Sequence, residues 1–170
     1  MPAGLDRIDL KILDRLQTDA SESSSEIAER VGLSQSPCWR RMQRLKDEGY
    51  VREQVAVLDR EKLGESMYIF AQLKMSRLND DDRDRFVSAI QHIPEITEAY
   101  TLFGEKDVLL KVLAPNIDWY QRFTFRTVLR LPGVEDVHST ATLSELKCTH
   151  RLPLPELTSS EGSKGDDRSG

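Results

Sequence analysis

The chain has 170 residues, of which 38% are hydrophobic and 31% are charged, and its formal net charge is −5. This length suits one ordinary domain or two small ones, and the composition is typical of a soluble globular protein. The apolar runs are far shorter than the roughly 20 residues of a membrane-spanning helix. The first residues also lack the apolar core of a secretion signal. We therefore expect a cytoplasmic protein that has no membrane partner.

The cysteines and histidines give no sign of metal or redox chemistry. The chain contains Cys38, Cys148, His92, His138 and His150. The spacing of these residues matches no metal-ligand motif. So few cysteines suit a reducing compartment, where disulfides are rare. Because we find no nucleophile with its base and no metal cluster, we expect neither an enzyme nor a metal or other cofactor.

Two short helices are predicted at the start of the chain. The first has apolar residues at every fourth position, namely Ile8, Ile12 and Leu16, which is the pattern of an amphipathic helix. Ser23 and Glu26 have the spacing of a capping box at the start of the second helix. Gly32 ends that helix and permits a sharp turn.

A third helix follows this turn. Its apolar side consists of Cys38, Met42 and Leu45. Ser34 or Ser36 is the expected cap, Pro37 suits the first turn, and Gly49 stops the helix. Two helices joined by a tight turn that contains glycine predict a helix-turn-helix.

The third helix is strongly basic although the whole chain is acidic. Residues 34–46 contain Arg40, Arg41, Arg44 and Lys46 and no acidic residue. The arc opposite the apolar side would carry Gln35, Ser36, Trp39, Arg40, Gln43 and Arg44. Arginine pairs with guanine and glutamine with adenine in the major groove, so this arc predicts recognition of double-stranded DNA, while Ser34 and Arg41 are better placed for phosphates. Two alternatives stay open: an ordinary solvated face, and a dimer contact made by Trp39.

The rest of the chain predicts a second, different domain. Residues 50–58 are rich in β-formers and predict a strand or small hairpin, and the polar residues 59–66 predict a linker. After it, strands and helices alternate in the order β-α-β-β-α-β, over residues 67–75, 80–93, 96–103, 108–114, 117–131 and 134–147. This order closes most simply as a ferredoxin-like antiparallel sheet with both helices on one face.

The predicted organisation is therefore α+β, a winged-type helix-turn-helix followed by a ferredoxin-like βαββαβ domain. Its four parts are a DNA-binding domain (1–58), a linker (59–66), a sensing and oligomerisation domain (67–155) and a disordered tail (156–170). Each domain is small, so burial against a second copy of the chain would add stability.

The motifs together resemble the leucine-responsive/asparagine-regulator (Lrp/AsnC) family of bacterial and archaeal transcription regulators. The resemblance covers about residues 4–155 and includes LDRIDLKILDRLQ, EIAERVGLSQSPCWRRMQRLKDEGYV, YTLFGEKDVLLKV, LRLPGVEDVHSTATLSELK and the closing RLPLP. The CWRR stretch looks most like members that respond to cysteine or related small amino acids. One departure concerns Ser21 and Glu22, which stand where the family often has a basic and then an apolar residue. A phosphate contact at that point is therefore in doubt.

The resemblance implies an amino-acid pocket between subunits, lined by the loop from Gly104 to Asp107. Gly104 would let a ligand carboxylate approach backbone N–H groups, and Asp107 would accept hydrogen bonds from the α-ammonium. The implied effector-binding set is Thr101, Phe103, Gly104, Glu105, Lys106, Asp107, Thr140 and Thr142. The threonines suggest a small or polar effector. From the residues alone, an ordinary tight turn in which Asp107 bonds to the backbone is the commoner explanation of the loop.

The resemblance also implies function and assembly. We expect a sequence-specific transcription regulator of amino-acid metabolism, forming homodimers that assemble into octamers and bind two half-sites. Two alternatives are an oligomeric amino-acid sensor that does not bind DNA and a ferredoxin-like catalytic domain with a helical accessory module. The sequence leaves open which amino acid acts, which operator is bound, and whether transcription is activated or repressed.

Overall fold

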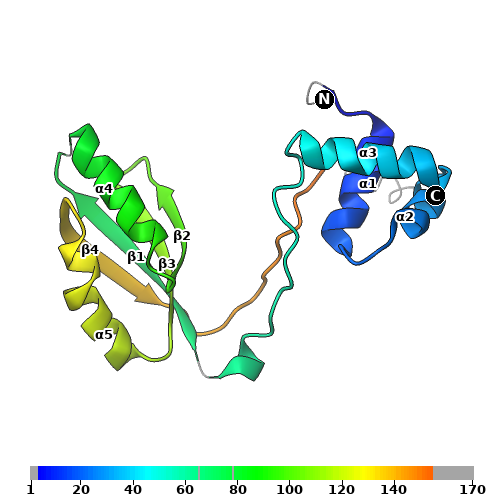
Figure 1. The fold of residues 1–170 in the computed structure, drawn as a ribbon. Coiled ribbons are helices and arrows are strands. Elements are labelled where there is room, and N and C mark those ends of the chain that lie inside the picture. Colours follow the sequence, from blue (N-terminus) through cyan, green and yellow to red (C-terminus); the bar gives the residue numbers. More distant parts are fainter. Residues whose placement is uncertain (1–3, 65, 78, 155–170) are drawn as a thin grey trace, which may run out of the picture. The chain divides into compact units, whose positions relative to one another are not determined.

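The fold is taken from a computed structural model that describes residues 4–64, 66–77 and 79–154. The chain forms two compact units (Figure 1). The first contains residues 4–57 together with 147–154, and the second contains residues 58–146. Residues 147–154, placed with the sensing domain by the sequence, thus make their contacts in the first unit. The tail predicted over residues 156–170 lies outside the described residues.

The first unit is built on α1 (Arg7–Thr18), α2 (Ser24–Val31) and α3 (Gln35–Asp47). Local signals define the helix ends: Asp6 and Ser23 each form a capping box at the start of α1 and α2. Gly32 follows α2 with a φ of 75°, a conformation that favours glycine. The predicted helix-turn-helix is confirmed.

All three helices contribute to the core of the first unit. The predicted apolar side of α3 is confirmed, since Cys38, Met42 and Leu45 are buried. The departure at Glu22 has a structural explanation. Its carboxylate accepts hydrogen bonds from Arg15 and lies 3.1 Å from Arg30 Nε, so it joins α1 to α2.

The strand predicted over residues 50–58 is wrong. Residues 52–59 have no regular secondary structure, and Val55 and Val57 are 68% and 74% exposed. A β-rich segment becomes a strand only when a neighbour supplies its ladder of hydrogen bonds. Within the described residues, no strand pairs with this segment.

The second unit is a four-stranded sheet with two α-helices. Its elements are β1 (Met67–Met75), α4 (Asp80–Gln91), β2 (Ile96–Thr101), β3 (Val108–Ala114), α5 (Ile117–Arg126) and β4 (Val134–Ala141), with short 3-10 turns at Glu61–Leu63 and Val128–Arg130. The strand order is β2-β3-β1-β4 and every pairing is antiparallel. The predicted ferredoxin-like fold is confirmed, although β4 ends before the predicted residue 147.

One face of this sheet is covered by α4 and α5 (Figure 1). Alternate residues of β1, such as Ile69 and Leu73, pack there against Phe86 of α4 and Phe123 of α5. The intervening residues therefore face the other way. Because Gln72 of β1 pairs with His138 of β4, that opposite face brings these polar side chains together.

Candidate functional site

The outward face of α3 carries the polar and aromatic side chains predicted for DNA. Gln35, Ser36 and Arg40 are exposed and Trp39 is 53% exposed, while Gln43 is partly exposed. Arg40 forms no ion pair within the described chain. This face is therefore available for a partner.

The start of α3 differs from the starts of the neighbouring helices. Ser34 is the N-cap residue, but its side chain makes no capping hydrogen bond, and the first turn has no acidic residue. In α1 and α2, capping boxes satisfy the first N–H groups and an acid lies in the first turn. Free N–H groups and the positive end of a helix dipole suit a phosphate. The start of α3 therefore fits a phosphate contact at Ser34.

Two of the predicted DNA-binding arginines turn back onto α1. Arg41 Nη1 lies 2.6 Å from Asp6 Oδ2 and 2.8 Å from Asp9 Oδ1, and Arg44 Nη2 lies 2.5 Å from Asp9 Oδ2. These bonds to carboxylates raise the pKa of Arg41, with that to Asp6 contributing most. The acids lie more than thirty positions earlier in the sequence, so no local pattern in α3 reveals the pairing.

In the second unit, the loop between β2 and β3 is fixed by Asp107. Its Oδ2 accepts a hydrogen bond from Met75 N at 2.8 Å and lies 3.1 Å from Lys74 Nζ. Its own N–H donates to Leu73 O at 2.9 Å. The bond from Met75, followed by that from Lys74, lowers the pKa of the Asp107 carboxyl. Asp107 thus secures the loop against β1, and its carboxylate is already hydrogen-bonded without a ligand ammonium.

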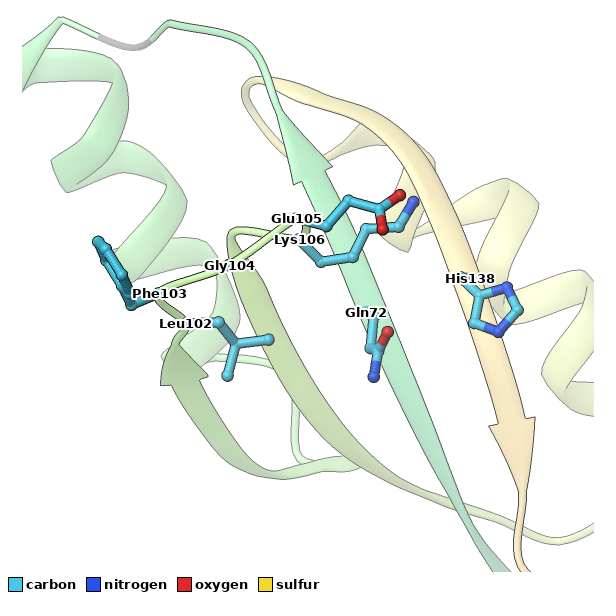
Figure 2. Close-up of a pocket in the computed structure, with 7 residues that line it drawn as sticks. All are labelled: Gln72, Leu102, Phe103, Gly104, Glu105, Lys106 and His138. Carbon is cyan, nitrogen blue, oxygen red and sulfur yellow. The ribbon is translucent and has the colours of Figure 1, made fainter.

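The same loop borders an open depression of about 550 Å³. Its lining, shown in Figure 2, consists of Gln72, Leu102, Phe103, Gly104, Glu105, Lys106 and His138. A Cβ added at Gly104 would meet nothing within 4 Å. The space beside this glycine is therefore open to a small molecule.

Four of the predicted effector residues lie in this lining: Phe103, Gly104, Glu105 and Lys106. The other four, Thr101, Asp107, Thr140 and Thr142, do not. Thr142 Oγ1 instead donates to Tyr68 O at 2.8 Å.

Gln72 and His138 were missed by sequence reasoning. They are single polar residues on separate strands, and the only signal that unites them is the pairing of β1 with β4. Lys106 Nζ lies 2.8 Å from Asp136 Oδ2 on β4, which also holds this side of the loop near His138 (Figure 2).

Among the residues that the structure describes, no group of three or more His, Cys, Asp and Glu side chains could hold a metal ion. In the same part of the chain, no helix is long and apolar enough to cross a bilayer.

The fold and these sites define a class: a helix-turn-helix DNA-binding regulator joined to a small-molecule-binding domain. Residues 5–52 match the family described as winged helix-turn-helix DNA-binding. Residues 68–152 match the Lrp/AsnC ligand binding domain. The chain belongs to the Lrp/AsnC family of transcription regulators, and it is a DNA-binding regulator controlled by an amino-acid effector.

Similar proteins agree with this assignment. The leucine-responsive regulatory protein of Klebsiella pneumoniae is 38% identical over 150 residues, covering 88% of this chain and 92% of that protein. A transcriptional regulator from Neisseria meningitidis, solved in complex with L-Met, has a TM-score of 0.84 at 35% identity, covering 90% of this chain and 99% of the other. An AsnC family transcriptional regulator from Agrobacterium tumefaciens has a TM-score of 0.84 at 34% identity, with coverage of 90% and 99%.

Proposed function

We propose that α3 reads an operator sequence through Gln35, Ser36, Trp39, Arg40 and Gln43. The observation that carries this proposal is the exposed Arg40, which has no acidic partner within the described residues. A free guanidinium on a helix that enters the major groove can bind guanine O6 and N7 with two hydrogen bonds. Ser34 and the N–H groups at the start of α3 bind a neighbouring phosphate and set the register of the helix on the duplex.

The test replaces Arg40 with alanine in the full-length protein. The duplex is one that the wild type selects from a random-sequence pool, and a scrambled duplex serves as reference. Arg40→Ala should weaken binding to the selected duplex by about 1–3 kcal/mol and to the scrambled duplex much less. Arg83→Ala, an exposed arginine of α4, is the matched control and should change neither. Equal weakening on both duplexes would assign Arg40 to a phosphate, and unchanged binding would remove α3 from the interface.

For the effector site, we propose the depression beside Gly104. The open space at Gly104 accommodates an amino-acid carboxylate, while Glu105 is a candidate partner for the ammonium group because Asp107 is already hydrogen-bonded. Gln72 and His138 give the lining a polar side, which supports an effector with a small or polar side chain. The solved relative from Neisseria carries L-Met, so methionine and leucine are the informative competitors.

Calorimetry with individual amino acids tests the effector class. Serine, cysteine or asparagine should bind more tightly than leucine and methionine. Tighter binding of leucine or methionine would refute the preference for a small or polar effector. The location of the site is tested independently by the Gly104→Val variant.

We further propose that the chain forms homodimers that assemble into octamers. Phe70 and Leu109 project from the sheet face opposite α4 and α5 and are only partly buried. A second copy of the sheet would bury them, and a two-fold dimer would present two recognition helices to two half-sites. Effector control then requires that the ligand bind one assembly state more tightly than another. Sedimentation analysis with and without the effector tests this scheme, and a monomer at micromolar concentration would refute it.

A further inference from the structure

Asp9 is an unusual residue for a DNA-binding unit. Its side chain is 1% exposed, and it is the one charged residue that is buried in the described part of the chain. It lies in the first turn of α1, where its Oδ2 accepts a hydrogen bond from Asp6 N at 3.0 Å. A buried carboxylate needs partners that compensate its charge. Here those partners come from the helix proposed to read DNA.

The carboxylates of Asp6 and Asp9 and the guanidinium groups of Arg41 and Arg44 form a cluster of ion pairs. Asp9 binds Arg41 through Oδ1 and Arg44 through Oδ2, and Asp6 binds Arg41 at 2.6 Å. The side chains of Arg41 and Arg44 are 30% and 41% exposed. Arg44 Nε is itself buried without a hydrogen-bond partner in the structure described, and it lies 3.9 Å from Glu48 Oε1.

The other two basic residues of α3, Arg40 and Lys46, form no ion pair within the described residues. Lys46 Nζ donates only to the neutral amide of Gln54 at 3.3 Å. The basic segment that the sequence presents as one continuous patch is therefore divided. Arg41 and Arg44 are paired to α1, and Arg40 is left free on the outward face.

We propose that Asp9, assisted by Asp6, is a positioning and specificity-determining residue for DNA binding. It holds Arg41 and Arg44 against α1 and withholds their charge from DNA phosphates. The consequence for specificity is direct, since binding to any duplex grows with the number of phosphates that cations neutralise, whereas discrimination comes from contacts to bases. This inference rests on the proposed role of α3, and it predicts that an acidic residue improves discrimination by suppressing non-specific affinity.

The decisive variant is Asp9→Asn in the full-length protein, which keeps the side-chain shape and removes the charge. Binding to a scrambled duplex is measured by fluorescence anisotropy over a range of NaCl concentrations. Each released arginine that reaches a phosphate should steepen the slope of log K against log salt by about 0.9. We expect a slope steeper by about one to two, several-fold tighter binding to the scrambled duplex at low salt, and a smaller preference for the selected duplex.

Asp14→Asn is the matched control, because Asp14 is also on α1 but pairs with Arg151 at 3.2 Å. It removes the same charge from the same helix and should leave the slope and the preference unchanged. If both variants change the salt slope equally, the effect comes from the altered net charge and not from the released arginines, and the proposal is overturned. Loss of binding to both duplexes by Asp9→Asn, with an unchanged circular dichroism spectrum, would also overturn it.

A second pair of variants keeps the proposal testable if Asp9→Asn does not fold. In the wild-type background, Arg41→Gln should barely change the salt slope because its charge is already neutralised, while Arg40→Gln should weaken binding to the selected duplex more than to the scrambled one. A slope shallower by about one in Arg41→Gln would show that Arg41 contacts phosphate and would overturn the inference. Unchanged binding of Arg40→Gln to the selected duplex would instead count against the proposed function of α3 itself.

Discussion

Gln17 and Leu152 are joined by hydrogen bonds in both directions. Leu152 N donates to Gln17 Oε1 at 2.9 Å, and Gln17 Nε2 donates to Leu152 O at 3.0 Å. Arg151 adds a contact to Asp14, also on α1. The chain therefore returns to the helix-turn-helix unit after β4, and residues 147–154 pack as part of that unit.

Gln17→Ala should free this returning segment. The variant loses the two hydrogen bonds with Leu152 and a third from Gln17 to Asp14 at 3.2 Å. Each is worth about 1 kcal/mol or less at a solvent-accessible site, so global stability should fall only slightly. Hydrogen–deuterium exchange provides the sharper measurement, and the Leu152 amide should lose protection while the amides of α3 keep theirs. Lys11→Ala, an exposed change on the same helix, is the control. Unchanged protection of Leu152 in Gln17→Ala would contradict the pairing.

Asp107→Asn should loosen the loop that borders the proposed effector site. The variant removes the ion pair with Lys74 and weakens the hydrogen bond from Met75, so we expect a fall in melting temperature of a few degrees and weaker effector binding. Glu105→Gln tests the opposite case: it should leave the melting temperature unchanged, because only its backbone carbonyl bonds to Lys74, and weaken effector binding alone. An unaltered melting temperature in Asp107→Asn would show that the contacts of Asp107 with Lys74 and Met75 do not stabilise the fold.

Gly104→Val should abolish the response to the effector without affecting folding. The glycine is free of steric contacts and does not adopt a positive φ, so valine fills open space and unfolds nothing. Thermal-shift measurements should show the wild-type melting temperature without effector and no rise when effector is added. Gly104→Ala should be intermediate. Effector affinity that stays at the wild-type level in Gly104→Val would remove this loop from the site.

The Glu22 bridge should make the helix-turn-helix unit sensitive to acid. The hydrogen bond from Arg15 is the largest influence that lowers the pKa of Glu22 below its ordinary value of 4.5. A carboxyl whose pKa is lower in the folded state stabilises the fold when ionised, so its contribution is complete above about pH 4.5 and is lost as the pH falls through the folded-state pKa.

Urea unfolding of wild type and Glu22→Gln at several pH values measures this contribution. The wild type should be more stable near neutral pH, and the difference should shrink progressively below about pH 4.5. Glu29→Gln, an exposed neighbour on α2, controls for the removal of a negative charge. A difference independent of pH would assign the effect to packing instead of the ion pair.

The sequence by itself determined the elements whose signals are local. Capping residues such as Ser23 and the four-residue apolar repeat specify helix ends and buried sides within one or two turns. The order β-α-β-β-α-β was equally visible, because each strand and helix has its own periodicity. These features depend on neighbours a few positions away, which is why they could be predicted from the residues alone.

The tertiary structure alone decided which side chains meet. Residues 50–58 have the composition of a strand, but a strand needs a partner and the described chain supplies none. Gln72 and His138 become neighbours only through the pairing of β1 with β4. The sequence predicts that Arg41 and Arg44 belong to a basic DNA-binding surface. In the folded chain, both form hydrogen bonds with Asp9. The physical reason is that charge pairing acts through space, between groups that the chain separates by more than thirty residues.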